Sequence, residues 1–102
     1  MIAFSDKNLS IGILEINPGQ KLSKHNRPVL ESLFQIKGKC VMKLFEDDST
    51  INKIVLDEGQ SIDIPPFKFH IHSNPYNKKS ITFWKTNGDI AEIINKIRTN
   101  KM

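Results

Sequence analysis

The 102-residue sequence contains a single cysteine, no long apolar run and almost no helical periodicity. Cys40 has no second cysteine with which to form an internal disulfide, which is typical of a reducing compartment, so we expect a cytoplasmic protein. No stretch approaches the roughly 20 apolar residues of a membrane span. The opening residues, MIAFSDKNLSIGIL, also lack the basic and long apolar regions of a signal peptide. We therefore expect one small soluble domain and no membrane partner.

Acidic residues are fewer than basic ones, with 11 Asp and Glu against 15 Lys and Arg, and the formal net charge is +4. Such an excess raises the question of a nucleic-acid partner. The lysines, however, are spread from Lys7 to Lys101 and are often offset by nearby acids, as in EDD and LDEG. The basic and aromatic interleaving of RNA-binding segments does not occur. A dispersed basic surface explains the charge better, and we expect no nucleic-acid partner.

Short segments rich in branched and aromatic residues make up most of the chain. Turn signals separate them: NPG, KGK, EDDST, DEG, PP and NPYNKK. Strands this short, with turns about every ten residues, predict an all-β sandwich or closed barrel. The eight predicted strands are residues 9–16, 20–27, 29–37, 39–46, 51–56, 61–64, 67–74 and 80–86.

The pattern changes after residue 86. Four isoleucines recur at helical spacing: Ile90, Ile93, Ile94 and Ile97. Asp89 with Glu92 three residues later makes an Asp variant of a capping box. These features predict a short C-terminal α-helix over about 89–99, following a barrel over about 9–86. No linker or repeat divides the chain, so we expect one domain over 1–102.

Polar and charged residues interrupt the predicted strands at fixed spacings. From Gly19 to Gly38 the chain reads G-x5-H-x-R-x3-E-x6-G, and from Gly59 to Asn74 it reads G-x5-P-x4-H-x3-N. These segments resemble the two motifs of the cupin family, G-x5-H-x-H-x3-E-x6-G and G-x5-P-x-G-x2-H-x3-N. Eight positions match in the same order: Gly19, His25, Glu31, Gly38, Gly59, Pro65, His70 and Asn74.

The resemblance implies a double-stranded β-helix, a jelly-roll barrel that is open at one end and holds a divalent metal inside. Carried over by position, the metal ligands are His25, Glu31 and His70. His72 lies two residues after His70, hence on the same face of a straight strand, and is a further candidate ligand. Imidazole and carboxylate groups suit iron, manganese, nickel or zinc.

Two positions depart from the motifs. Phe67 stands where the third glycine of the second motif belongs, and Arg27 stands where the second histidine of the first belongs. Arg27 cannot bind a metal because its guanidinium stays protonated. At about 5 Å it would repel a dication by roughly 6–7 kcal/mol at an effective dielectric near 20. It could instead grip a carboxylate or phosphate. The structural alternative is an Arg27–Glu31 ion pair within a polar network left from a lost metal site.

Three functions remain open at this point. The first is a metal-dependent enzyme acting on a small anionic metabolite, with His70 and Arg27 as catalytic candidates; the family's metal enzymes include dioxygenases, decarboxylases, lyases and isomerases. The second is a metal-free isomerase or epimerase with a histidine as general base. The third is a non-catalytic module that binds a small molecule. Metal analysis of the purified protein distinguishes the first from the second.

A barrel of this size has a small core and leaves sheet edges to be covered. Small cupins commonly pair through their outer sheet faces. We therefore expect a homodimer.

Overall fold

The computed structural model describes residues 2–5, 9–47 and 49–86. Within these residues the chain forms antiparallel strands and no helix, which confirms the predicted all-β class. The helix predicted over about 89–99 lies outside the described residues. The strands are β1 (Ile2–Ser5), β2 (Ser10–Ile16), β3 (Glu31–Lys37), β4 (Cys40–Phe45), β5 (Ile51–Leu56), β6 (Ser61–Ile64), β7 (His70–Ser73) and β8 (Ser80–Thr86).

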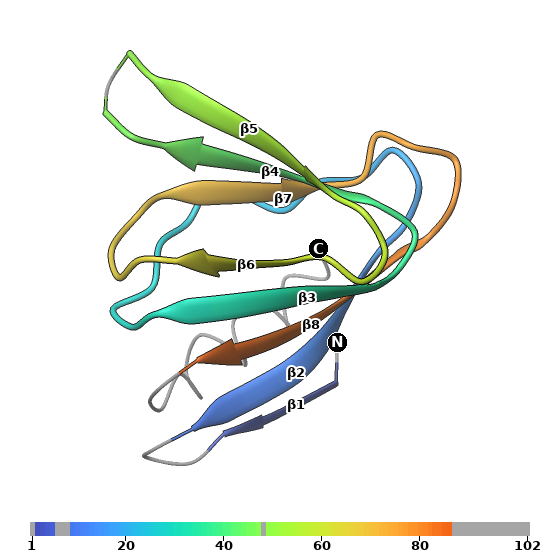
Figure 1. Ribbon diagram of the computed structural model, residues 1–102, viewed down its shortest axis with the longest axis horizontal. Helices are drawn as coiled ribbons and strands as arrows, with labels where there is room; N and C mark the ends of the chain where they lie inside the picture. The colour runs from blue at the N-terminus through green and yellow to red at the C-terminus, as the bar shows by residue number, and fades with distance from the viewer. Residues whose placement is uncertain (1, 6–8, 48, 87–102) are drawn as a thin grey trace.

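The strands form two sheets that lie one over the other (Figure 1). The larger sheet has the order β1-β2-β8-β3-β6, and the smaller has the order β5-β4-β7. Neighbours in each sheet are mostly distant in sequence, since β3 pairs with β8 and β6, and β4 pairs with β7. This order brings the two halves of the chain together in one barrel, as a jelly roll does.

The segment 20–27 is not the regular strand that we predicted. It makes only two isolated bridges to β7, Lys21 with Ser73 and His25 with His70. Leu22 is the one apolar residue of this segment, so the segment lacks the alternation of apolar and polar side chains that is typical of a regular strand. The backbone still follows β7: the His25 amide donates to the His70 carbonyl at 3.0 Å, and the reverse bond is 2.8 Å long. The segment therefore extends the smaller sheet and places His25 beside His70.

Strand β1 is a further difference from the prediction, because no strand was expected before residue 9. Its residues pair with β2 in the register Ala3 with Gly12 and Phe4 with Ile11. Ala3 packs against the core, whereas the Phe4 side chain is exposed. A stretch of four residues is too short for its alternation to be recognised in the sequence.

Two of the matching motif residues outside the site, Gly38 and Asn74, have structural roles. Gly38 has a φ of 68°, and a Cβ there would clash with the Lys79 carbonyl oxygen, so only glycine fits. The buried Asn74 side chain donates to the Ile16 carbonyl at 2.9 Å and to the Lys78 carbonyl at 2.7 Å. These contacts connect the end of β2 with the loop that precedes β8.

The core lies between the sheets and is built from the inward residues of the alternating strands. Its members are Leu14, Ile16, Leu22, Leu33, Cys40, Met42, Leu44, Leu56, Ile64 and Trp84. Polar side chains share these inward faces. Glu31 begins β3 on the same face as Leu33 and Gln35, and all three are buried. Gln35 is satisfied by Ser80 and Thr82, whereas Glu31 lies at the opposite end of β3.

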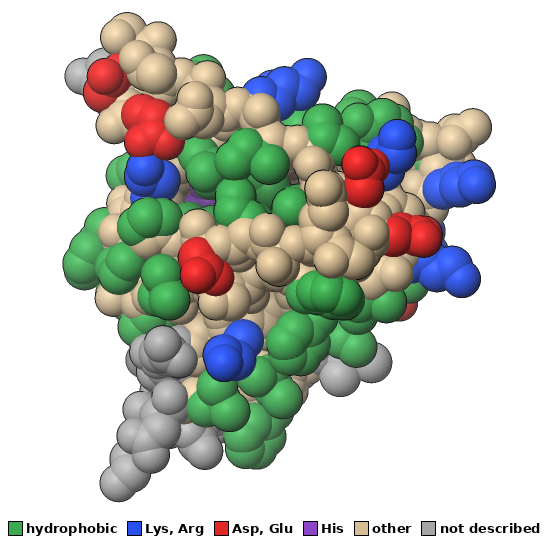
Figure 2. All heavy atoms as spheres, viewed as in Figure 1, with side chains coloured by type: hydrophobic (Ala, Val, Ile, Leu, Met, Phe, Trp, Pro, Cys, Tyr) green, Lys and Arg blue, Asp and Glu red, His purple; other side chains and the backbone are tan. Residues whose placement is uncertain are grey.

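The outer surface carries scattered charges and several exposed apolar side chains. Figure 2 shows Lys and Arg dispersed among Asp and Glu on one face, with apolar side chains between them. Exposed examples on the larger sheet are Phe4 and Phe34. No helix in the described ranges is long and apolar enough to cross a membrane.

Candidate metal centre

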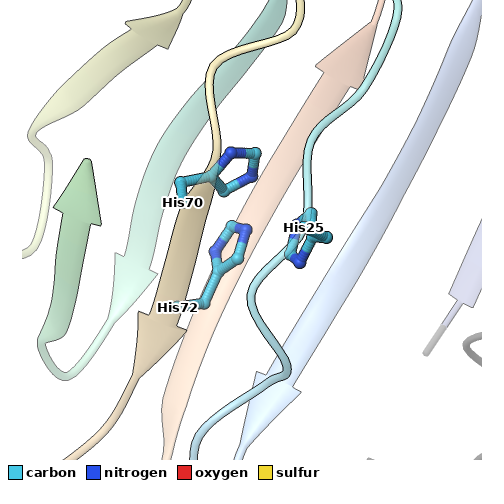
Figure 3. Close-up of side chains that lie close together, drawn as sticks. All are labelled: His25, His70 and His72. Carbon is cyan, nitrogen blue, oxygen red and sulfur yellow. The ribbon is translucent and has the colours of Figure 1, made fainter. Parts of the chain in front are cut away.

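Three histidines converge inside the barrel. His70 and His72 project inward from β7, and His25 meets them from the segment that runs beside that strand (Figure 3). One ring nitrogen from each lies within 4.8 Å of the other two. The ring centroids are 4.2 Å apart for His25 and His70, and 5.1 Å apart for His70 and His72. The parity of His72 with His70 thus places it in the same cluster.

The backbone fixes the orientation of two of these rings. The Nδ1 atom of His25 lies 2.8 Å from the Ser23 carbonyl oxygen, and that of His70 lies 2.9 Å from the Lys68 carbonyl oxygen. Because a carbonyl oxygen can only accept, each Nδ1 carries the proton and each Nε2 keeps a free lone pair. Metal-binding histidines are commonly oriented in this way.

A bend before His70 makes this arrangement possible. Phe67 has a φ of 65°, in the left-handed region that favours glycine. Phe67 stands where the cupin motif has glycine, and it adopts this conformation at a cost that glycine would not incur. After the bend, Lys68 points outward and pairs with Glu46, while its carbonyl faces His70. Without the bend, Lys68 would share the inward face of the histidines, because it lies two residues before His70.

Glu31 reaches the cluster from the larger sheet. Its carboxylate oxygens lie 3.6 Å from His70 Nε2 and 3.8 Å from His72 Nε2. Glu31 Oε2, His70 Nε2 and His72 Nδ1 are buried and make no hydrogen bond within the described part of the chain. Buried polar atoms are nearly always paired, so several unpaired ones at one place indicate a binding site. A divalent metal fits this donor set of imidazoles and a carboxylate.

Burial sets the protonation states of the cluster. Together with the charge of Arg27 and the neighbouring His70 ring, burial lowers the pKa of His25 to about 3. Burial also lowers the pKa of His70 and lowers that of His72 well below its usual range. The imidazoles are therefore neutral at neutral pH, which is the form that binds metals. Burial raises the pKa of Glu31 to about 7, against the opposing effect of the Arg27 charge.

Arg27 lies close to the cluster and acts on it through its charge. Its half-buried guanidinium donates from Nη1 to the Asn26 carbonyl at 3.0 Å. Its charge lowers the pKa values of the three histidines and opposes the rise at Glu31. No ion pair joins Arg27 to Glu31 among the described residues. The remaining N–H donors of the guanidinium are therefore not held by that carboxylate.

Comparison with known proteins identifies the fold. No protein-family model and no curated protein sequence match the chain. Among solved structures, an oxalate oxidase in complex with glycolate is similar with a TM-score of 0.74 and 18% identity, over 79% of this chain and 42% of that one. The S161A mutant of Bacillus subtilis oxalate decarboxylase gives 0.74 and 20%, over 81% and 22%. The DMSP lyase DddQ from Ruegeria pomeroyi gives 0.72 and 16%, over 84% and 41%.

These three proteins all have the cupin fold. The chain spans less than half the length of each, and at this identity the likeness shows the fold alone. This chain therefore has the cupin fold, and the prediction made from the spacing of its motifs is confirmed.

Proposed function

We propose that this protein binds a divalent transition metal through His25, His70 and His72, with Glu31 as a fourth donor, and holds a small anionic molecule beside it. The observation that carries the metal site is the convergence of three ring nitrogens within 4.8 Å, next to a buried carboxylate. Neutral imidazoles with one carboxylate suit iron, manganese, nickel or zinc. A bound dication would act as a Lewis acid toward an oxygen of the ligand.

Arg27 supports the anionic character of that ligand. Its guanidinium is half-buried, acts electrostatically on the cluster and is not paired with Glu31 in the described part of the chain. A bidentate contact from arginine to a carboxylate or phosphate contributes on the order of 1.5–3 kcal/mol. The similar oxalate oxidase was solved with glycolate, a small carboxylate. Small carboxylates and sugar phosphates are therefore the ligands to test first.

The charge of Arg27 also favours a second candidate function. A cation that lowers the pKa of three neighbouring histidines would weaken the binding of a dication as well. A metal-free site that binds an anion with Arg27, with or without a histidine acting as general base, is the resulting alternative.

Metal titration separates these candidates. We expect calorimetry with Mn²⁺, Co²⁺ and Zn²⁺ to show one site per chain. His25→Ala, His70→Ala and His72→Ala should each weaken metal binding strongly, because each variant keeps only three of the four donors. Lys24→Ala is the matched control beside His25, on the outer surface over Phe45. A wild type that binds none of these metals at millimolar concentration would leave the metal-free alternative. Full metal binding by His72→Ala would exclude that residue from the site.

The anion is tested with Arg27→Gln. This variant should bind Mn²⁺ at least as tightly as the wild type, because the repulsive charge is gone, and should bind glycolate roughly 10–100-fold more weakly. Lys24→Gln removes a nearby positive charge without touching the cluster and should retain glycolate binding. Equal losses in the two variants would show a general charge effect and contradict the anchoring role of Arg27.

A further inference from the structure

Thr86 carries a hydroxyl that is buried inside the barrel. It ends β8, in which alternate side chains point into the barrel, and it is 1% exposed. Its Oγ1 makes no hydrogen bond within the described residues. Thr82, on the same face of the same strand, shows the usual situation, because its Oγ1 donates to Gln35 Oε1 at 2.6 Å. An unpartnered buried hydroxyl is unfavourable for folding and requires an explanation.

The strand register places this hydroxyl next to the candidate metal centre. Thr86 pairs with Glu31 across β8 and β3, and both side chains face inward. Directly opposed residues of antiparallel strands have Cβ atoms about 4.5–5.5 Å apart. Glu31 in turn contacts His70 and His72 through its carboxylate.

The unpartnered atoms form one group. Among the described residues, the buried side-chain atoms without a hydrogen bond are Glu31 Oε2, His70 Nε2, His72 Nδ1 and Thr86 Oγ1. The first three belong to the candidate metal centre, and the fourth belongs to the cross-strand neighbour of Glu31. A metal would satisfy nitrogen and carboxylate donors, but a neutral hydroxyl is a weaker ligand and a good hydrogen-bond donor to an anionic oxygen.

We propose that Thr86 is a positioning residue for the bound anion and that its hydroxyl donates a hydrogen bond to a ligand oxygen lying against the metal. This inference rests on the proposed function of the same centre and adds a second contact to the one expected from Arg27. The ligand class that fits is a small acid with more than one oxygen acceptor, such as a hydroxy acid or a dicarboxylate, because two separate donors then face it.

The test compares Thr86→Val, which removes only the hydroxyl, with Thr86→Ser, which keeps it. Calorimetric titration of the Mn²⁺-loaded proteins uses glycolate, oxalate and inorganic phosphate as probes. Thr86→Val should bind Mn²⁺ as the wild type does, but should bind the preferred anion about 10-fold more weakly, and Thr86→Ser should restore binding.

The stability of the metal-free proteins separates this role from a structural one. Thr86→Val should melt at the same temperature as the wild type or higher, since no hydrogen bond is lost. The control Thr82→Val should melt lower, because Gln35 loses its partner, with no selective loss of anion binding. Wild-type anion affinity in Thr86→Val, or a melting temperature as low as that of Thr82→Val, would overturn the inference. If the wild type binds Mn²⁺ but none of the three anions, the anionic part of the proposed function is wrong, and this inference is wrong with it. If anions bind, the comparison of the variants tests the role of Thr86 alone.

Discussion

Glu31 places an ionisable carboxyl among buried groups, and this should destabilise the metal-free fold. Burial raises its pKa from 4.5 to about 7 although Arg27 opposes the shift. Since one pKa unit corresponds to about 1.4 kcal/mol, a fully ionised Glu31 destabilises the folded state by roughly 3 kcal/mol. Glutamine has the shape of the protonated acid and cannot ionise. We expect Glu31→Gln to stabilise the metal-free protein at pH 8 by up to about 3 kcal/mol.

The sign of the pH dependence follows from the direction of the shift. Because the folded-state pKa lies above the unfolded value, the stability associated with Glu31 is present below about pH 4.5, falls as the pH rises to about 7, and is constant above. Glu31→Gln lacks this loss, so the two proteins should be equally stable near pH 4.5. The lowered pKa of His25 destabilises the fold as the pH falls below 6.5, but both proteins share that effect.

Urea unfolding in EDTA at pH 5 and pH 8 measures this difference, with the buried Trp84 as the fluorescent probe. In thermal unfolding, a gain of about 3 kcal/mol corresponds to more than about 10 °C for a domain of this size. Added Mn²⁺ should reverse the order, because only the wild type supplies a carboxylate to the dication. If Glu31→Gln is the less stable protein at pH 8 in EDTA, the carboxylate makes a stabilising contact that the structure lacks, and the reasoning is wrong.

Three further predictions concern the scaffold. Phe67→Gly should stabilise the protein by about 0.5–1 kcal/mol in urea unfolding, because glycine adopts its φ of 65° without the left-handed penalty; a loss of stability would mean that the phenyl ring makes a larger contribution than its exposure indicates. Gly38→Ala should cost roughly 3 kcal/mol through left-handed strain and the contact with the Lys79 carbonyl, whereas Gly59→Ala, which has open space around its Cβ position, should cost about 1–2 kcal/mol. Equal losses would contradict the packing argument. Light scattering should give twice the chain mass of 11.7 kDa, because apolar side chains such as Phe34 lie exposed on the larger sheet, and a monomer at micromolar concentration would exclude the dimer.

Much of the fold could be predicted from the sequence because its signals are local. Turn residues and the alternation of inward and outward side chains are set within a few positions. Of the eight strands in the described ranges, seven therefore lie within predicted segments. The segment 20–27 was predicted to be a regular strand, which is wrong. Hydrogen bonds to β7 fix its position, and its own residues give no indication of these bonds. Strand β1 was missed because only its pairing with β2 makes it a strand.

Most residues of the candidate site could also be predicted from the sequence, but one could not. His25, Glu31 and His70 were found by motif spacing, and His72 was found by its parity with His70. Thr86 carried no signal, because its connection to Glu31 exists only through the pairing of β8 with β3. Sequence spacing identifies groups that act within one strand or turn, whereas groups brought together by strand register become visible only in three dimensions.

The two departures from the cupin motifs lie next to each other in the structure. The Phe67 amide donates to the Arg27 carbonyl at 2.7 Å, and the Asn26 side chain donates to the Phe67 carbonyl at 3.2 Å. Both changes therefore fall on two hydrogen-bonded segments beside the cluster. On the proposed assignment, His72 supplies the third imidazole that the motif would take from position 27. That leaves position 27 free to carry a permanent positive charge, so the centre would keep a full set of metal donors and also select its ligand by charge.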